Sequence, residues 1–303
     1  MLKTYIAGGY GFLGQHIFLA FEGKAYRDKK FNLTNTIDAA QSVSGVDMVI
    51  NAAGRTAGIL ANQQRPADLY LQNLITGTFL MEAARQAGCK KFIQIGTVCS
   101  YPKNIPTPMQ EDHFWNGYPE KTNAAYGLAK KALVVQAQAY RKQYGFMTVN
   151  PILANLYGPG DHYELEVSHV IPALIVKMLD AAENKDPFVV LWGTGKCTRD
   201  FLFVEDAAQA IKLLADTYES SEIINVASGR ETSIRDVAES VATACNFKGD
   251  LRWDSSKPDG QPRRVFDIHK ISQLGWSAKT SLKNGILAAV EDCKQWRLKH
   301  VAA

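Results

Sequence analysis

The chain has 303 residues, of which 46% are hydrophobic and 21% are charged. This composition is typical of a globular protein with a substantial core, and it excludes a disordered, collagen-like or low-complexity chain. The formal charge of +4 is too small and too dispersed for a footprint on a phosphate backbone, so we expect no nucleic-acid partner.

Apolar runs of strand length alternate with helix-period segments through the first half of the chain. This pattern predicts βαβ units and therefore a parallel sheet. In chain order we expect strand 4–7, helix 12–21, strands 24–26 and 47–51, helix 68–86, strand 91–95, helix 124–144 and strand 147–152.

Beyond residue 160 the pattern loosens and indicates a second, mixed lobe that exchanges segments with the first. Its expected elements are a helix from residue 170, strand 188–192, helix 205–218, strand 223–226 and helices 233–244 and 281–296. The fold class that follows is α/β, with a Rossmann-type doubly wound parallel sheet and a smaller mixed α/β lobe.

The five cysteines form no Cys-x-x-Cys pair and no cluster with histidine at zinc-ligand spacing. The sequence therefore predicts neither a disulfide framework nor a metal site, and a reducing compartment fits the free thiols better. The first residues enter a strand where a signal peptide would have an apolar segment, and no apolar run approaches a membrane span. We expect a cytoplasmic protein with no membrane partner.

A glycine-rich turn follows the first expected strand and opens the first helix. Gly8, Gly11 and Gly14 recur at every third position, and Phe12 and Leu13 fill the last interval. Glycines allow a tight turn and bring backbone N–H groups close to a pyrophosphate, which then lies at a helix N-terminus. A plain turn is the alternative, but the position at the first strand-to-helix junction favours dinucleotide binding.

The end of the second strand bears on which dinucleotide is bound. An acidic residue there binds the ribose 2′-hydroxyl and repels a 2′-phosphate. Here Arg27, Lys29 and Lys30 surround a single acid, Asp28. We therefore favour NADP (NADPH) over NAD (NADH), the alternative being solvated surface charges. The ends of the next two strands supply further coenzyme positions at Asn32, Leu33 and Ala53.

With this coenzyme site, the chain divides into two predicted domains. Residues 1–160 form the NADP(H)-binding Rossmann domain, to which segments at about 198–220 and 262–272 return. Residues 161–303 form mainly the substrate-binding lobe.

Tyr126 and Lys130 lie four residues apart on the expected helix 124–144, so both side chains lie on one face. A phenol has an ordinary pKa of ~10, and a nearby ammonium stabilises the phenolate and brings the group closer to the operating pH. The Tyr-x-x-x-Lys spacing occurs by chance in many helices. Together with the glycine turn and with Thr97 after strand 91–95, the pair predicts a site of general acid or base catalysis.

This constellation resembles the extended short-chain dehydrogenase/reductase superfamily. Further segments resemble the GDP-L-fucose synthases, and they occur in family order from the amino-terminal loop to late in the chain. The segments are 59–62, 65–68, 99–103, 155–159, 168–174, 192–195 and 257–260.

The resemblance implies an NADPH-dependent 3,5-epimerase/4-reductase that converts GDP-4-keto-6-deoxy-D-mannose to GDP-L-fucose. The C4 carbonyl of this substrate acidifies the hydrogens on C3 and C5, so epimerisation needs a base, an acid and a stabilised enolate. By resemblance Cys99 and His169 carry these protons, in an order that stays open. Thr97 hydrogen bonds the C4 oxygen, Tyr126 protonates it, and Lys130 holds the coenzyme.

The resemblance also implies the remaining binding residues. The coenzyme would contact Leu153, Asn155, Leu156 and His169 in addition to Lys130. The nucleotide sugar would contact Lys177, Trp192, Arg199 and Asp259. Lys177 and Tyr10 stand where the family has arginines, which leaves room for a different sugar or a weaker hold on the 2′-phosphate.

Three other functions stay open. A related epimerase-reductase would act on another GDP-4-keto sugar, either a heptose or a dideoxyhexose. A redox-neutral, NAD-dependent 4-epimerase would consume no coenzyme, and a coenzyme-sensing module would not need Tyr126. By analogy with the superfamily, helices 68–86 and 124–144 would form the contact of a homodimer.

Overall fold

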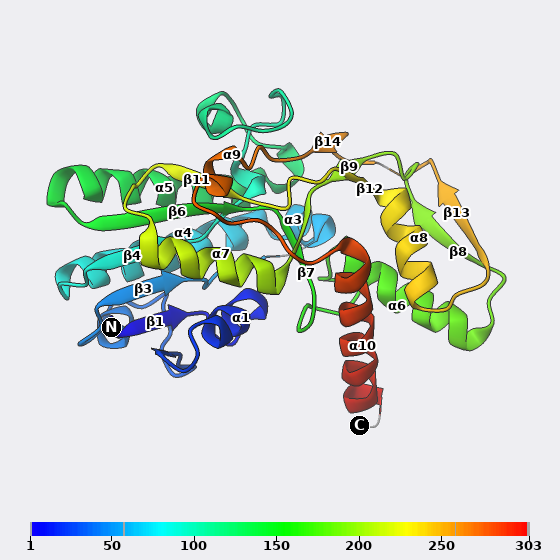
Figure 1. Cartoon of the computed structure of the whole chain (residues 1–303), viewed down its shortest axis with the longest axis horizontal. Coiled ribbons are helices and arrows are strands. Elements are labelled where there is room, and N and C mark those ends of the chain that lie inside the picture. The colour runs from blue at the N-terminus through cyan, green and yellow to red at the C-terminus, as the bar shows by residue number, and fades with distance from the viewer. Residues whose placement is uncertain (1, 57, 258, 302–303) are drawn as a thin grey trace.

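A seven-stranded sheet forms the centre of the larger lobe, and its strand pairs are parallel (Figure 1). The computed structural model describes residues 2–56, 58–257 and 259–301. The strands follow the order β11-β6-β4-β3-β1-β2, and β5 pairs with β6 beside this path. Their bounds are β1 (Thr4–Ala7), β2 (Ala25–Tyr26), β3 (Met48–Asn51), β4 (Lys91–Gln94), β5 (Gly96–Thr97), β6 (Met147–Leu153) and β11 (Ile223–Val226).

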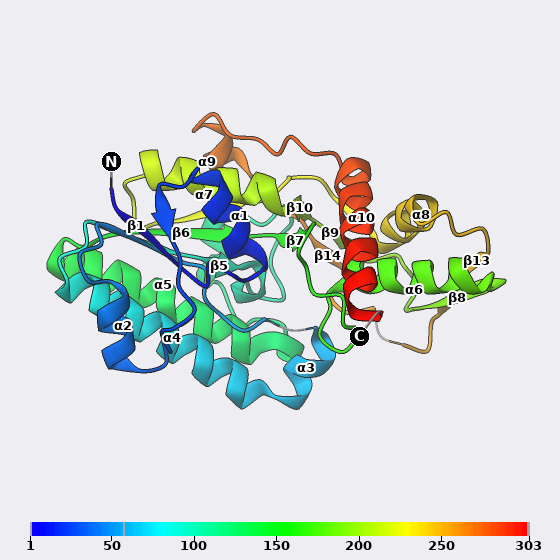
Figure 2. The same ribbon diagram turned by 90° about the horizontal axis from the view of Figure 1, so that it is seen from below.

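Helices cover both faces of the sheet. On one face α1 packs on α7, and on the other α4 packs on α2 and α5 (Figure 2). Strands β1, β3 and β4 are buried at every residue, as parallel strands between two helical layers are. The helix bounds are α1 (Phe12–Ala20), α2 (Thr36–Ser42), α4 (Pro66–Gln86), α5 (Ala124–Tyr144) and α7 (Val204–Thr217).

Local chemistry sets the ends of several helices. α4 begins at Pro66, whose missing N–H would have no partner in the first turn. α5 ends at Gly145, which adopts a left-handed conformation with φ of 65°. α2 begins after Asn35, whose side-chain oxygen accepts hydrogen bonds from the N–H groups of Ile37 and Asp38 at 2.8 and 3.2 Å.

A smaller lobe has its own hydrophobic cluster. Three helices pack around a parallel pair of strands there, namely α6 (Val170–Asn184), α8 (Ile234–Ala244) and α10 (Leu282–Val301) with β8 (Phe188–Trp192) and β13 (Asp250–Asp254). Two short sheets lie between this lobe and the main sheet (Figures 1 and 2). Their strands are β7 (Asn155–Tyr157) with β10 (Phe201–Phe203), and β9 (Thr198–Arg199) with β12 (Thr232–Ser233) and β14 (Arg263–Arg264).

The predicted α/β fold, with a doubly wound parallel sheet and a second mixed lobe, is confirmed. Strand 223–226 had been grouped with the second lobe, but as β11 it pairs with β6 in the main sheet. A four-residue apolar run does not reveal which sheet it joins, because only its register with a neighbour decides. The domain boundary at residue 160 stays a prediction.

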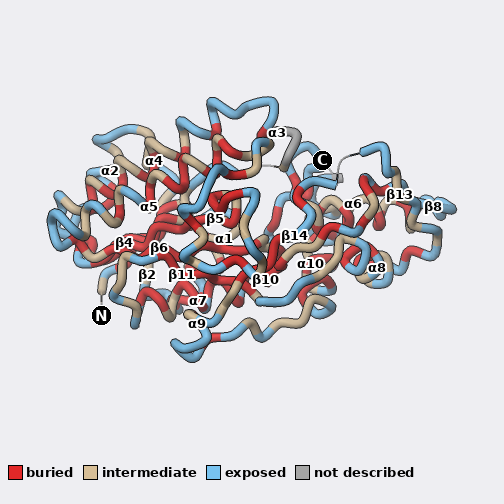
Figure 3. Tube along the Cα trace, turned by 90° about the horizontal axis from the view of Figure 1, so that it is seen from above, coloured by how far each residue is buried: buried red, intermediate tan, exposed pale blue. Residues whose placement is uncertain are grey.

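The pattern of burial follows the layers. Figure 3 shows the strands of the main sheet as the buried centre, with exposed residues on the outer turns of the helices. None of the helices described within residues 2–56, 58–257 and 259–301 is both long and apolar enough to cross a membrane.

Candidate active site

The glycine turn lies between β1 and α1, where a tight path of the backbone requires its glycines. Gly8 has φ of +73°, a left-handed conformation that costs glycine little, and the N–H of Gly11 donates to its carbonyl at 2.9 Å. A side chain at Gly14 would collide with that same carbonyl. Because Gly11 at the N-cap has no side chain, the N-terminus of α1 is left uncapped, as a pyrophosphate site requires.

A pocket of about 540 Å³ opens beside this turn. The buried Oε1 of Gln72, a residue that lines it, has no hydrogen-bond partner among the described residues. A bare glycine turn and an unsatisfied acceptor beside a pocket fit a dinucleotide. Five of the predicted coenzyme residues line it, namely Gly8, Gly11, Asn32, Leu33 and Ala53.

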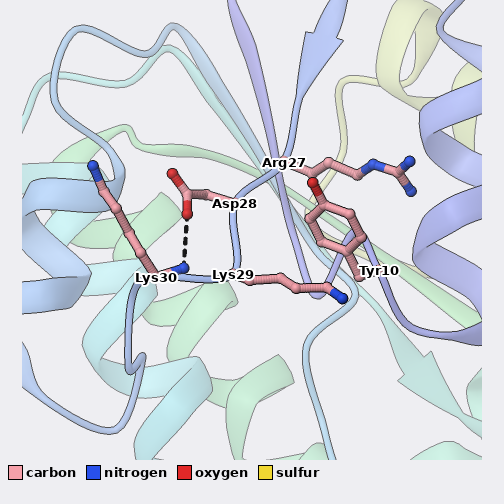
Figure 4. Close-up of a pocket in the computed structure, with 5 residues that line it drawn as sticks. All are labelled: Tyr10, Arg27, Asp28, Lys29 and Lys30. Carbon is pink, nitrogen blue, oxygen red and sulfur yellow. Dashed lines mark hydrogen bonds between the residues drawn. The ribbon is translucent and has the colours of Figure 1, made fainter.

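An adjoining open pocket of about 650 Å³ is lined by the basic segment after β2 and by Tyr10. The Tyr10 ring lies between two cations (Figure 4), with the Arg27 guanidinium 4.3 Å and the Lys29 ammonium 4.6 Å from its centre. Arg27 also donates to the carbonyl of Gly9 at 2.8 Å and stacks on Phe18 at 4.2 Å. The position of Arg27 is therefore fixed by packing on both sides.

The single acid of the basic segment is turned into its own loop. The Asp28 carboxylate accepts a hydrogen bond from the backbone N–H of Lys30 at 2.7 Å (Figure 4). Three cations line the same pocket as Asp28, namely Arg27, Lys29 and Lys30. The pocket thus has an excess of positive charge, which suits an anionic group.

Thr97, Cys99 and Tyr126 meet at the carboxyl ends of β5 and β6. Thr97 pairs with Leu153 across these strands, and its hydroxyl oxygen accepts a hydrogen bond from the Cys99 N–H at 3.3 Å. The Thr97 side chain also hydrogen bonds to Tyr126, on which Cys99 acts electrostatically. Three residues predicted from separate segments are therefore brought together.

Close packing of α5 on the short helix η1 (Val98–Ser100) holds this cluster. A side chain at Gly127 would collide with the carbonyl of Cys99, and the Ser100 hydroxyl donates to the Gly127 carbonyl at 2.9 Å. Asn123, just before α5, donates from Nδ2 to the Cys99 sulfur at 3.2 Å. Asn123 was not among the predicted site residues, because an asparagine before a helix ordinarily indicates only a cap.

Burial controls the electrostatics of the Tyr126 and Lys130 pair. Their exposed fractions are 8% and 5%. Burial raises the pKa of the Tyr126 phenol above its ordinary value, with Cys99 adding to the rise and Thr97 opposing it. Burial also lowers the pKa of Lys130 to about 8.

We had expected the ammonium to bring the phenol closer to neutral pH, and this expectation was wrong. Desolvation outweighs any nearby charge at Tyr126, and Lys130 is not among the groups that shift its pKa. Tyr126 therefore remains protonated at neutral pH, which suits a proton donor.

His169 immediately precedes α6, as its N-cap residue. Its side chain is exposed although protein surrounds it densely, and this desolvation, followed by repulsion from His162, lowers its pKa. His169 makes no hydrogen bond to Cys99 or Tyr126 in the described part of the chain. The structure thus brings Cys99 and Tyr126 together, but not His169 with them by direct contact.

The predicted sugar-nucleotide residues are dispersed over the second lobe. Arg199 on β9 is half-buried, donates to the carbonyls of Thr198 and Gln261 at 2.7 Å each, and is close enough to Cys99 to interact electrostatically. Lys177 is half-buried on α6, and Trp192 at the end of β8 is 65% exposed.

Asp259 joins two loops of this lobe. Its carboxylate accepts from the backbone N–H of Thr194 at 2.6 Å and from the Thr194 hydroxyl at 2.7 Å, which lowers the pKa of Asp259. Its neighbour Pro258, part of the family-like segment 257–260, lies outside the described residues. The side chains of residues 59–61, in another such segment, lie outside them too.

The remaining predicted coenzyme residues do not line the two pockets. Gly14 is buried under the turn, Leu153 ends β6, and Asn155 on β7 donates to the carbonyl of Asp200 at 3.1 Å. Phe12, Leu13 and Leu156 are half-buried near them. Among the described residues, no group of His, Cys, Asp or Glu side chains could hold a metal ion.

Comparison with known proteins identifies the family. Residues 4–227 match the model of the NAD dependent epimerase/dehydratase family. The GDP-L-fucose synthase 1 of Arabidopsis thaliana is 37% identical over 307 residues, which cover 99% of this chain and 94% of the plant protein.

Solved structures agree with the sequence comparison. A GDP-L-fucose synthetase from Naegleria fowleri bound to NADP superposes with a TM-score of 0.85 at 26% identity, covering 99% of this chain and 95% of its own. A GDP-6-OMe-4-keto-L-xylo-heptose reductase from C. jejuni gives a TM-score of 0.88 at 26% identity, covering 97% and 98%. The chain therefore belongs to the NAD dependent epimerase/dehydratase family and, within it, to the GDP-L-fucose synthases.

Proposed function

We propose that the protein is an NADPH-dependent 3,5-epimerase/4-reductase that converts GDP-4-keto-6-deoxy-D-mannose to GDP-L-fucose. The observation that carries this proposal is the meeting of Thr97, Cys99 and Tyr126 at the carboxyl ends of β5 and β6. A plain ketoreductase needs the hydroxyl and the phenol but has no use for a thiol beside them. Membership of the family supports the same reaction.

The epimerisation half needs a base and an acid at C3 and C5. The Cys99 sulfur or the His169 imidazole removes the C–H proton, and the electron pair moves toward the C4 oxygen to give an enolate. A proton then returns to the opposite face of the same carbon, so the step is balanced without an oxidant. The lowered pKa of His169 keeps its ring neutral near pH 7, able to accept a proton.

The reduction half needs one hydride and one proton. When bound, the reduced nicotinamide supplies the hydride to C4. Tyr126 gives its proton to the C4 oxygen, to which Thr97 donates a hydrogen bond, and the phenolate left behind regains a proton from solvent. The raised pKa of Tyr126 keeps that proton in place until the reaction needs it.

The basic pocket supports NADPH as the preferred coenzyme. The Arg27 guanidinium stacks on both Tyr10 and Phe18, and the Lys29 ammonium also lies over the Tyr10 ring. The carboxylate that would repel a 2′-phosphate is engaged by the backbone of Lys30. We infer that the 2′-phosphate binds at this edge, and a kcat/KM ratio that favours NADH would contradict it.

Arg199 is the cation best placed for the diphosphate. It lies on β9, between the second lobe and the cluster of Thr97, Cys99 and Tyr126. Two backbone carbonyls accept hydrogen bonds from one side of its guanidinium. Its remaining N–H groups suit phosphate oxygens, and exposed Trp192 offers a flat surface to a base or sugar.

Incubation with a panel of GDP-linked 4-keto sugars and either coenzyme tests the proposal directly. We expect GDP-L-fucose from the deoxymannose substrate, with one NADPH consumed per product, identified by NMR. If a 4-keto heptose or dideoxyhexose is consumed faster than the deoxymannose substrate, that sugar is the substrate instead. Turnover without loss of NADPH absorbance would contradict the proposed reduction and indicate a redox-neutral epimerisation.

We also propose that α4 and α5 form a contact with a second copy of the chain. Leu71 on α4 and Val135 on α5 are 55% and 51% exposed, so both helices present an aliphatic side chain that a second copy would cover. Light scattering should give the mass of a dimer, and Val135→Glu should give that of a monomer. A monomeric parent protein would contradict this contact.

A further inference from the structure

Asn123 does not act as the helix cap that its position predicts. Asparagine is a favoured N-cap because its side-chain oxygen accepts from the first free N–H groups of the helix. Asn123 holds the N-cap position of α5, yet its side chain makes no capping hydrogen bond. Its amide turns instead to Cys99, and Nδ2 donates to the sulfur at 3.2 Å.

The frame around this contact is rigid. Asn123 ends the short helix η3 (Lys121–Asn123), three residues before Tyr126, so the same turn positions the phenol and the amide. α5 lies against η1, which carries Cys99, because glycine at position 127 lets the Cys99 carbonyl approach. The amide and the sulfur therefore keep their relative positions.

Within the part of the chain that the structure describes, no other hydrogen bond explains the orientation of this side chain. Its Oδ1 is buried and has no hydrogen-bond partner among the described residues. Leaving a buried acceptor unsatisfied costs free energy, and so does giving up a cap. The hydrogen bond to the Cys99 sulfur is the contact that this orientation of Asn123 makes in place of the cap.

We propose that Asn123 is a positioning residue that holds the Cys99 sulfur as a hydrogen-bonded thiolate, aimed for proton abstraction from the sugar. A thiolate has no proton to donate, so only a donor such as the Nδ2–H group can bond to it. Abstraction turns the thiolate into a thiol and weakens that bond, and return of the proton to solvent restores it.

Two other ionisable groups act on Cys99. Tyr126 from α5 and Arg199 from β9 both interact with it electrostatically. Tyr126 is neutral at working pH, and Arg199 is a cation. Asn123 differs from both because it fixes direction as well as charge. The inference rests on the proposed function only where it names proton abstraction.

The first test measures the thiol without any substrate. Alkylation of Cys99 by iodoacetamide at pH 8 is followed by mass spectrometry of its peptide, which separates it from the four buried cysteines. Asn123→Asp keeps the size but removes both donors, and it should slow alkylation about tenfold, the loss expected for one hydrogen bond to a charged group. Asn116→Asp, at an exposed asparagine in the same region, should leave the rate unchanged.

Two more variants keep the test decisive if Asn123→Asp folds poorly. Asn123→Ser retains a donor and should recover much of the alkylation rate, whereas Asn123→Ala should not. A slow rate in Asn123→Asp and Asn123→Ala but not in Asn123→Ser supports the proposal. Equal rates in all variants, or an equal loss in Ser and Ala, would overturn it.

The second test separates this inference from the proposed function. Deuterium exchange at C3 and C5 in D₂O should fall with alkylation in Asn123→Asp, while single-turnover hydride removal from GDP-L-fucose by NADP⁺ should change less than twofold. If alkylation falls but exchange does not, the contact holds the thiolate and Cys99 is not the base. That result would overturn the positioning role in abstraction and the base assignment, while leaving reduction intact.

Discussion

The proton-transfer cluster and the proposed sugar-nucleotide site differ in how they are built. Tyr126 and Lys130 are 8% and 5% exposed and lie on a long helix against the sheet, whereas Trp192 is 65% exposed at the end of a small lobe's strand. The first site is rigid before any ligand arrives. The second draws its side chains from α6, β8 and β9 and from the loop that carries Asp259.

This difference separates reaction from substrate choice. A buried cluster can fix where protons go, at a cost in stability that burial of charge imposes. Exposed loops cost little and can change without disturbing the chemistry. Substitutions in the buried proton-transfer cluster should therefore lower the catalytic rate, whereas substitutions in the exposed site should lower the affinity for the nucleotide sugar.

The largest expected effect is on the buried side. Tyr126→Phe removes the proton donor and should lower hydride transfer by roughly 10²- to 10⁴-fold, since that is the usual contribution of a general acid. KM should change little, because the ring stays in place. Stopped-flow loss of NADPH absorbance measures the step, and a variant with near-parent rate would move the acid elsewhere.

Burial of Lys130 should appear as a cost in stability. Its pKa falls from 10.5 to about 8, which corresponds to about 3 kcal/mol. Between pH 8 and 10.5 the unfolded chain binds more protons at this residue, so the parent protein gains stability as the pH rises through this window.

Lys130→Met should therefore raise the free energy of unfolding of the coenzyme-free protein below pH 8. The gain should shrink as the pH rises from 8 through 10.5 and vanish well above pH 10.5, where the lysine is neutral in both the folded and the unfolded parent. Urea titrations at pH 7 and pH 10 measure it. A variant less stable than the parent at pH 7 would show that the ammonium has a favourable partner.

On the exposed side, the expected changes are smaller and concern affinity. Asp259→Ala removes both bonds to Thr194 and frees two loops, so KM for the nucleotide sugar should rise about fivefold with kcat nearly unchanged. Asp250→Ala, on a strand of the same lobe, is the matched control. An equal fall in kcat would place Asp259 with the chemistry.

The smallest change is expected at the edge of the coenzyme pocket. Lys29→Ala should lower kcat/KM for NADPH about threefold to fivefold and leave NADH unaffected, because an exposed cation contributes modestly to a phosphate contact. Salt should reduce the difference. Lys24→Ala, outside the pocket, is the control, and equal losses for both coenzymes would remove Lys29 from the 2′-phosphate site.

The sequence predicted the buried side far better than the exposed side. The glycine turn, the Tyr126 and Lys130 pair and the strands around them follow from local patterns, because spacing on one element places side chains together. The elements α2 and β13 escaped prediction, since α2 spans only seven residues and β13 is polar at three of its five positions.

Features that depend on two distant segments could not be predicted. The Asn123 contact joins the short helices η1 and η3 across 24 positions, and the hydrogen bonds of Asp259 to Thr194 join two loops 65 positions apart. The pKa of Tyr126 was predicted in the wrong direction because burial, which the sequence does not reveal, exceeds the effect of a neighbouring charge.

The most direct measurement of the central claim is deuterium exchange in Cys99→Ser. The parent protein and Tyr126→Phe should incorporate solvent deuterium at C3 and C5 of GDP-4-keto-6-deoxy-D-mannose, followed by NMR. Cys99→Ser should lose this exchange and keep hydride transfer. Exchange at the parent rate in Cys99→Ser would contradict the account, because the thiol would then have no part in epimerisation.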